Sequence, residues 1–305
     1  MKSAAYVGRF APSPTGPLHY GSLLAALASY CDARSHQGQW LLRIDDIDPP
    51  RMVEGAIDGI QRTLDDYGFE WDGPTLLQST RLADYQHAVE QLNELSLLYT
   101  CACSRKSLKG VSVYPGKCTP ATGDTEKWLH EKAQVLSKLQ SSNMAAAIRI
   151  RISENRVVQD QIQPPHTFHV GADIGDTIVV RRDNLIAYAL ACAVDDANGI
   201  THVVRGTDLL HATGAQLAIM ATLHTSMPTY AHIPVVVNTA NEKLSKQTKA
   251  NAIDAMPVVA TLKKAWQQLG QNPIEADNIA EFWTQAIAHW QLSKVPKQSQ
   301  LGPPE

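Results

Sequence analysis

Short apolar runs alternate along this chain with longer segments in which apolar residues recur every three to four positions. Runs of the first kind predict strands, and segments of the second kind predict amphipathic helices. Before residue 101, the expected strands span residues 4–10 and 39–44, and the expected helices span residues 19–35, 53–67 and 81–97. Strands and helices that alternate in this order are typical of a parallel sheet, so we expect an α/β fold.

Residues 101–170 break this alternation. They contain three cysteines, a helical run at 124–141, an apolar run at 146–152 and a Pro-Pro pair. We interpret them as an insertion between the two halves of a split Rossmann-like domain, which residues 1–100 and 171–249 would form.

The second half of that domain resumes the earlier pattern. Its expected strands span residues 176–182, 201–205 and 232–237, and its expected helices span residues 187–197 and 208–223. Residues 250–305 predict a short helical C-terminal segment, with helices at 258–269 and 276–290 and a Pro- and Gln-rich end that frays.

Composition limits the classes of protein that the chain can belong to. With 305 residues, 44% of them hydrophobic, it can bury one large core or two modest ones. The formal net charge of −3 gives no global attraction for polyphosphate, so a nucleic-acid partner would require a local basic face. No apolar run reaches the ~20 residues that span a bilayer, and the N-terminus is too short and polar for a secretory signal. We expect a cytoplasmic protein without membrane association, and a monomer, although nothing in the sequence bears on oligomeric state.

One polar motif falls where the first strand's loop turns into a helix: Arg9-Phe-Ala-Pro-Ser-Pro-Thr-Gly-Pro-Leu-His19-Tyr-Gly21-Ser22. The N-terminus of a helix presents unpaired N–H groups and a partial positive charge, which together can hold a phosphate. Gly21 would allow an adenine ring to approach closely, and His19 can donate a hydrogen bond to a phosphate oxygen. The alternative is a helix cap followed by an ordinary glycine.

A second motif, Lys243-Leu-Ser-Lys246-Gln, lies in a polar stretch without periodicity. Two lysines three positions apart on a loop can close over a pyrophosphate and stabilise its charge in a transition state. The alternative is a solvated basic loop.

Taken together, the two motifs resemble those of the class I aminoacyl-tRNA synthetases, which are His-Ile-Gly-His-like and Lys-Met-Ser-Lys-Ser-like. The glutamyl branch is similar over about residues 5–250, in the segments Arg9-Phe-Ala-Pro-Ser-Pro-Thr-Gly, Arg43-Ile-x-Asp46-Ile-Asp48, Val194-Asp195-Asp196 and Val204-Arg205-Gly206. This resemblance implies a Rossmann-like catalytic domain that joins an amino acid to ATP.

The cysteines suggest a metal site. The odd total of five argues against a disulfide framework, and Cys31 and Cys192 lie in Ala- and Leu-rich helical stretches, where a buried thiol is ordinary. Cys101-x-Cys103 and Cys118 have spacing compatible with tetrahedral zinc. No further Cys or His lies between residues 101 and 118, so the candidates for a fourth ligand are Tyr114, Ser104 and Ser107. The alternative is three free cysteines in a hairpin.

The glutamyl-queuosine tRNA(Asp) synthetases carry the motif Cys-x-Cys…Tyr-x-x-x-Cys in their insertion, and Tyr114-Pro-Gly-Lys-Cys118 is similar to it. This resemblance implies that Tyr114 completes a structural zinc site, one per chain. Glutamyl-tRNA synthetases continue after the lysine motif with a large anticodon-binding domain, whereas 56 residues follow Lys249 in this chain. That difference and the His-Tyr-Gly-Ser variant of the first motif also fit the glutamyl-queuosine group.

The resemblance implies a reaction in two steps. L-Glutamate attacks ATP, which carries Mg²⁺, to give glutamyl-adenylate, and the glutamyl group then passes to queuosine at the wobble position of tRNA(Asp). The catalytic domain would hold the anticodon stem-loop of that tRNA. The implied catalytic residues are His19 and Lys246, and the implied ATP-binding residues are His19, Gly21, Ser22, Lys243 and Lys246.

The implied glutamate-binding residues are Arg9, Phe10, Ala11, Pro12, Ser13, Asp45, Tyr188 and Arg205. An arginine fork suits the side-chain carboxylate, for which Arg9 and Arg205 are the candidates. Asp45 departs from the family pattern, which has Glu, so its carboxylate is one methylene shorter. Tyr188 could instead be a core aromatic in an Ala-rich helix.

Two other functions fit parts of the pattern. One is a truncated glutamyl-tRNA synthetase that charges the 3′ end of tRNA, and the other is a catalytically silent paralogue that acts as a zinc-held RNA-binding module. Lys106, Lys109 and Lys117 lie beside the cysteines and could contact RNA, or they could form a solvated charged loop.

Overall fold

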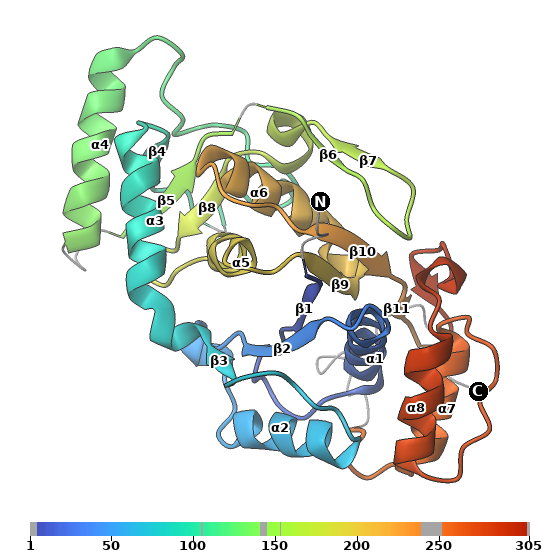
Figure 1. The fold of residues 1–305 in the computed structure, drawn as a ribbon. Coiled ribbons are helices and arrows are strands. Elements are labelled where there is room, and N and C mark those ends of the chain that lie inside the picture. Colours follow the sequence, from blue (N-terminus) through green and yellow to red (C-terminus); the bar gives the residue numbers. More distant parts are fainter. Residues whose placement is uncertain (1–4, 105, 141–144, 153, 239–251, 304–305) are drawn as a thin grey trace.

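A parallel sheet runs through the centre of the computed structural model, which describes residues 5–104, 106–140, 145–152, 154–238 and 252–303 (Figure 1). One part pairs β1 (Val7–Phe10), β2 (Gln39–Ile44) and β3 (Leu76–Leu77) in that order, and the other pairs β9 (His202–Gly206) with β10 (Thr229–Ile233). The two parts meet where the amide of Thr201, just before β9, donates to the carbonyl of Val7 at 2.9 Å. The parallel α/β sheet expected from the sequence is therefore confirmed.

Helices cover both faces of this sheet. The helices beside it are α1 (Tyr20–Ser35), α2 (Ala56–Asp66), α3 (Leu82–Glu94), α5 (Tyr188–Ala197) and α6 (Leu210–Thr222). Alternate strand residues enter separate cores: Trp40 and Leu42 pack with α1 and α2, while Leu41 packs on the side of α5 and α6. Because successive strand residues point to opposite faces, the sheet divides two apolar layers.

A second, antiparallel sheet joins β4 (Leu98–Cys101), β5 (Ala147–Ile150) and β8 (Thr177–Val180). Near it lie α4 (Thr125–Gln140), the hairpin of β6 (Arg156–Val158) and β7 (His166–Phe168), and a π-helix at Val170–Ile174 (Figure 1). The strand expected at 176–182 exists, but it pairs with β5 and not with the parallel sheet. Apolar runs of this length predict a strand without indicating its partner. β4 begins before residue 101 and β8 lies after residue 170, so this second sheet is not confined to the expected insertion. The boundaries of the insertion therefore stay a prediction.

The C-terminal helices α7 (Val258–Gln268) and α8 (Ile279–His289) pack against α1. Trp266, Phe282 and Trp290 from this region are buried in the same core as α1, and the indole of Trp290 donates to Asp32 at 2.9 Å. Gly68 has φ +75°, and a Cβ there would lie 2.5 Å from Ile279, so glycine lets α8 approach closely.

The expectation that the chain end frays is wrong. Gln300–Leu301 form the strand β12, which pairs in parallel with β11 (Val235–Val236), and Leu301 is only 9% exposed. The Pro- and Gln-rich composition concealed this pairing, because the partner strand lies more than sixty residues earlier in the chain.

Within the described ranges, no helix combines the length and the apolar character required to cross a bilayer.

Close helix packing at Gly214 predicts a cost for adding one methyl group. An ideal Cβ there would lie 2.6 Å from Ile174 Cδ1 and 2.8 Å from Phe168 Cγ. We expect Gly214→Ala to lower the free energy of unfolding by about 1–3 kcal/mol, measured by urea denaturation. The control is Gly59→Ala on α2, where an added Cβ would meet no described atom within 4 Å beyond the adjacent residues and backbone of its own helix, and where alanine favours the helix. Equal stability of the two variants would contradict this packing.

Candidate active site and cysteine cluster

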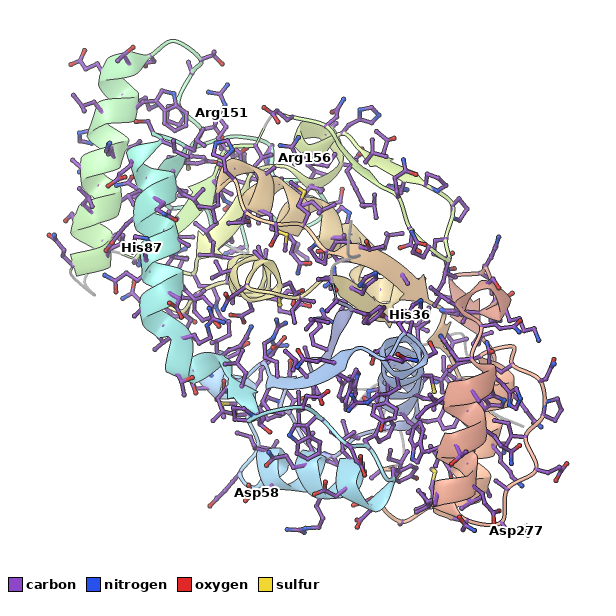
Figure 2. All side chains as sticks on the ribbon, in the orientation of Figure 1. His36, Asp58, His87, Arg151, Arg156 and Asp277 are labelled. Carbon is purple, nitrogen blue, oxygen red and sulfur yellow. The ribbon has the colours of Figure 1, made fainter. Side chains whose placement is uncertain are left out.

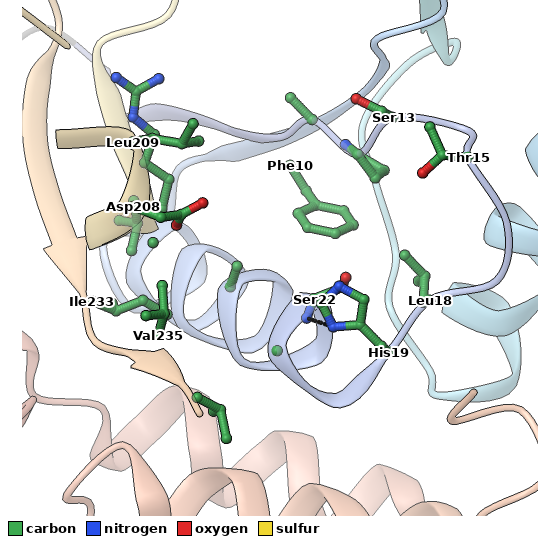
Figure 3. Close-up of a pocket in the computed structure, with 18 of the residues that line it drawn as sticks. Phe10, Ser13, Thr15, Leu18, His19, Ser22, Asp208, Leu209, Ile233 and Val235 are labelled. Atoms are coloured by element: carbon green, nitrogen blue, oxygen red, sulfur yellow. Dashed lines mark hydrogen bonds between the residues drawn. The ribbon is translucent and has the colours of Figure 1, made fainter. Parts of the chain in front are cut away.

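A cavity of about 640 Å³ opens where the carboxyl ends of β1, β9 and β10 meet. Figure 3 shows its two walls: Ser13, Thr15 and His19 lie on one side, and Asp208 and Ile233 lie on the other. Its lining residues are Arg9, Phe10, Ala11, Pro12, Ser13, Thr15, Leu18, His19, Gly21, Ser22, Ala25, Arg51, Tyr188, Val204, Arg205, Gly206, Asp208, Leu209, Ile233, Pro234, Val235 and Val236. Both halves of the parallel sheet therefore contribute to one site, in the position where open α/β sheets bind ligands.

The first motif forms the start of α1. His19 is the N-cap residue, and its Nδ1 accepts a hydrogen bond from the backbone N–H of Ser22 at 3.2 Å (Figure 3). A neutral His19 therefore carries its proton on Nε2, which makes Nε2 a donor. Since His19, Gly21 and Ser22 all line the cavity, the first turn of a helix borders it, as phosphate binding requires. The other half of the predicted nucleotide site, Lys243 and Lys246, lies outside the described residues.

Arg205 is the second-last residue of β9, and its side chain is almost completely buried. Its Nε donates to His232 Nε2 at 3.3 Å, and its Nη2 donates to Thr213 and Gln216, at 2.7 Å each. Its Nη1 is buried and has no hydrogen-bond partner among the described residues. A buried guanidinium nitrogen without a partner is costly, so an anionic group in the cavity would stabilise it.

Arg9 is held differently. Its Nε and Nη2 donate to the two carboxylate oxygens of Asp196, at 3.1 and 3.2 Å, and Arg43 Nη1 donates to the same carboxylate at 2.7 Å. Burial alone would raise the pKa of Asp196, but the charges of Arg9 and Arg43 hold it well below the ordinary range. Asp196 is therefore ionised and joins the first half of the chain to the second.

Asp45 and Tyr188 lie in contrasting places. Arg43 Nε donates to Asp45 at 2.7 Å, and Asp45 is buried outside the set of residues that line the cavity. Tyr188, the first residue of α5, lines the cavity and is 37% exposed, so it is not a core aromatic. The loop of Phe10, Ala11, Pro12 and Ser13 also lines the cavity.

Sequence reasoning missed several residues at this site. Asp208 is the only carboxylate among the described lining residues, and it follows β9 closely, at the edge where ligand-binding side chains are expected. This position after a predicted strand could have identified Asp208 as a site residue from the sequence. The residues behind Arg205, namely Thr213, Gln216 and His232, gave no signal, because their role depends on tertiary contacts.

The cysteine cluster forms beside β4, and none of its members lines the cavity. The sulfur atoms of Cys101, Cys103 and Cys118 all lie within 4.8 Å of one another. The hydroxyl of Tyr114 lies 3.4 Å from Cys101 Sγ and 3.9 Å from Cys103 Sγ, and Cys103 Sγ lies 3.7 Å from Cys118 Sγ. A tetrahedron with Zn–S bonds of ~2.3 Å has edges of roughly 3.8 Å, so these donors fit a zinc ion.

The fold and the site point to one class of protein. Residues 6–265 match the family model described as "tRNA synthetases class I (E and Q), catalytic domain". The crystal structure of the glutamate-tRNA synthetase from Elizabethkingia anophelis superposes with a TM-score of 0.76 at 22% identity, covering 97% of this chain and 68% of that one. At this identity the likeness bears on the fold alone.

Curated relatives narrow the class. A protein of Aromatoleum aromaticum named "Glutamyl-Q tRNA(Asp) synthetase" is 44% identical over 98% of this chain and 93% of its own length. A protein of the same name from Pseudomonas aeruginosa is 42% identical over 98% of each chain. The chain therefore belongs to the class I tRNA synthetases of the E and Q type, and among them to the glutamyl-Q tRNA(Asp) synthetase family.

The buried position of Asp196 predicts both its contribution to stability and the pH at which that contribution fades. We expect Asp196→Asn to lower the free energy of unfolding by about 3–5 kcal/mol at neutral pH, because it removes the carboxylate that Arg9 binds and one of the carboxylates that Arg43 binds. The folded-state pKa lies below the unfolded value of about 3.9, so this stabilisation is present above about pH 4 and is lost as the pH falls further.

Urea denaturation at several pH values measures this dependence, which should be steeper for the wild type than for Asp196→Asn below about pH 4. The matched control is Asp58→Asn, since Asp58 is exposed and points outward from α2 (Figure 2). If Asp196→Asn is as stable as this control at neutral pH, the ionic link does not stabilise the fold.

Proposed function

We propose that the protein uses ATP and Mg²⁺ to convert L-glutamate to glutamyl-adenylate, and that it transfers the glutamyl group to queuosine at the wobble position of tRNA(Asp) in the cytoplasm. Family membership supports the chemistry, and one observation carries the choice of substrate. Arg205 borders a cavity of about 640 Å³ with a buried nitrogen that has no partner in the described part of the chain. An acidic side chain is the natural partner of such a group.

We propose that ATP lies against the start of α1. His19, Gly21 and Ser22 would hold its phosphates, and Lys243 and Lys246 would close over them. The α-carboxylate of glutamate then attacks the α-phosphorus, and pyrophosphate leaves. The enzyme's contribution to such a step is positioning and charge neutralisation, so the reaction needs no strong general base.

We propose that glutamate lies against the loop of Arg9–Ser13 and beside Tyr188. Because Arg9 already donates to Asp196 through two nitrogens, Arg205 is the better candidate for the side-chain carboxylate. Asp45 accepts a hydrogen bond from Arg43 and is not among the residues that line the cavity. It would therefore reach the substrate ammonium through water or after leaving Arg43. Asp208 is a second anionic group that lines the cavity.

In the transfer step, a hydroxyl of the queuosine cyclopentene ring attacks the acyl carbon of the mixed anhydride. AMP leaves with the bonding electron pair, and the phosphate of the adenylate takes up the hydroxyl proton. We propose that residues 101–170 contact the anticodon stem-loop. Lys106, Lys109 and Lys117 are exposed beside the cysteine cluster, where they can contact phosphates. The expected monomer is part of this proposal.

We also propose that Cys101, Cys103, Tyr114 and Cys118 hold one structural Zn²⁺. Four protein ligands would fill a tetrahedral shell and leave no position for a reacting water. The ion would connect the end of β4 to the 114–118 loop. The guanidinium of Arg149, 3.8 Å from the centre of the Tyr114 ring, holds that ring in place.

The proposed reaction predicts where glutamate becomes attached. Incubation with radiolabelled glutamate, ATP and tRNA(Asp) should label only tRNA that contains queuosine, and removal of the 3′ adenosine should not release the label. Label that is lost with the 3′ adenosine would identify a truncated glutamyl-tRNA synthetase. Absence of glutamyl-adenylate would identify a non-catalytic RNA-binding paralogue.

The zinc proposal predicts a stoichiometry. The purified wild type should contain about one zinc per chain by mass spectrometry, and Cys118→Ala should lose it and unfold at a lower temperature. The control is Cys31→Ala, because Cys31 is a buried thiol in α1 outside the cluster, and its zinc content should match the wild type. Full zinc content in Cys118→Ala would exclude Cys118 as a ligand.

A further inference from the structure

We propose that Asp160 and His232 form a positioning pair that orients Arg205 and thereby sets the affinity of the pocket for the side chain of glutamate. The inference rests on the proposed function, since it assigns to Arg205 the recognition of that side chain. Asp160 lies in the loop after β6, and His232 lies on β10 directly opposite Arg205 in the β9–β10 ladder.

Asp160 is a buried anion held by several donors. Its Oδ1 accepts the backbone N–H groups of Ile162, Gln163 and His232 at 2.9, 2.8 and 3.1 Å, and its Oδ2 lies 2.5 Å from His232 Nδ1. Burial would raise the pKa of Asp160, but these hydrogen bonds hold it below the ordinary range. The carboxylate is therefore an acceptor, and His232 Nδ1 is the donor.

His232 is in turn a neutral imidazole of one tautomer. Burial lowers its pKa, and together with the positive charges of Arg205 and Arg9 it outweighs the hydrogen bond and negative charge of Asp160, which raise that pKa. With the proton on Nδ1, Nε2 is an acceptor that faces Arg205 Nε at 3.3 Å and the Thr213 hydroxyl at 3.0 Å. The Thr213 hydroxyl has a second acceptor, the carbonyl of Leu209 at 3.0 Å, so Nε2 can accept from Arg205. The opposite tautomer would direct an N–H group at the N–H group of Arg205.

This arrangement orients the third guanidinium nitrogen. A guanidinium is planar, so anchoring Nε on His232 and Nη2 on Thr213 and Gln216 also determines the direction of Nη1, the nitrogen left without a partner in the described structure. No atom of Asp160 or His232 lines the cavity among the described residues. Their effect on glutamate would be transmitted through Arg205, which makes them positioning residues.

The isosteric variant Asp160→Asn tests the pair. Its amide can donate to His232 Nδ1, which forces the imidazole proton onto Nε2 and breaks the contact with Arg205. In glutamate-dependent exchange of pyrophosphate into ATP, we expect the KM for glutamate to rise about 10- to 100-fold, as for loss of one hydrogen bond to a charged group. The KM for ATP and kcat should stay within about threefold.

Two further variants separate positioning from general destabilisation. His232→Gln keeps an oxygen acceptor near the Nε2 position and should recover most of the glutamate affinity, to within about fivefold of the wild type. Asp173→Asn is the matched control, because Asp173 accepts a backbone N–H from His169 in the same region without contacting Arg205, and all its constants should be unchanged. Thermal unfolding of each variant checks that the fold is intact.

An unchanged KM for glutamate in Asp160→Asn would overturn the inference, as would equal rises in both KM values. A wild type without any glutamate-dependent exchange would instead contradict the proposed function. In that case ¹⁵N NMR of the imidazoles still decides the arrangement. His232 protonated on Nδ1 in the wild type and on Nε2 in Asp160→Asn would support the pair, and one tautomer in both would overturn it.

Discussion

The carboxylate of Asp196 binds two guanidinium groups that come from the other half of the chain, and the geometry of the candidate active site depends on this contact. Arg9 lies in β1, just before the loop that forms one cavity wall, and Arg43 lies near the end of β2. Buried charges cost desolvation energy, which only good geometry offsets. The surrounding anions Asp45 and Asp195 supply that compensation, so the cluster favours one arrangement of β1, β2 and α5.

The cluster also separates two uses of arginine at the same edge of the sheet. Arg9 is committed to Asp196, and its role is to connect the halves. Arg205 is held by neutral partners, namely Thr213, Gln216 and His232, and no carboxylate of the described residues contacts it directly. A cation whose partners are all neutral attracts an anionic substrate more strongly than one already paired.

Sequence patterns predicted the helices well because the 3.6-residue period depends on local spacing. The expected helix at 208–223 is α6 at Leu210–Thr222, for example, and the strand at 39–44 is β2. The pairing partners of the strands were harder to predict from the sequence. The apolar run that became β8 gives no indication that it joins an antiparallel sheet, and β12 is hidden in a polar tail.

The same distinction applies to the site. Motifs indicated the loop of Arg9–Ser13 and the start of α1, and the structure brings these to one cavity with Tyr188 and Arg205. Arg43 and Asp45 are two positions apart at the end of β2, so an extended chain directs both side chains to one side. The motif assigned Asp45 to the substrate and gave no sign that Arg43 already pairs with it. The support behind Arg205 comes from α6, β10 and the loop after β6, so no local pattern contains it.

The parallel pairing of β12 with β11 places residues 299–301 directly behind the wall of the cavity. Val235 and Val236 line the cavity, and the backbone N–H groups of Val235 and Val237 donate to the carbonyls of Ser299 and Leu301. Thr207 donates to Ser299 as well. Residues 299–301 therefore brace the strand that borders the substrates, so deleting β12 would disturb the shape of the pocket although none of these residues is among those that line it.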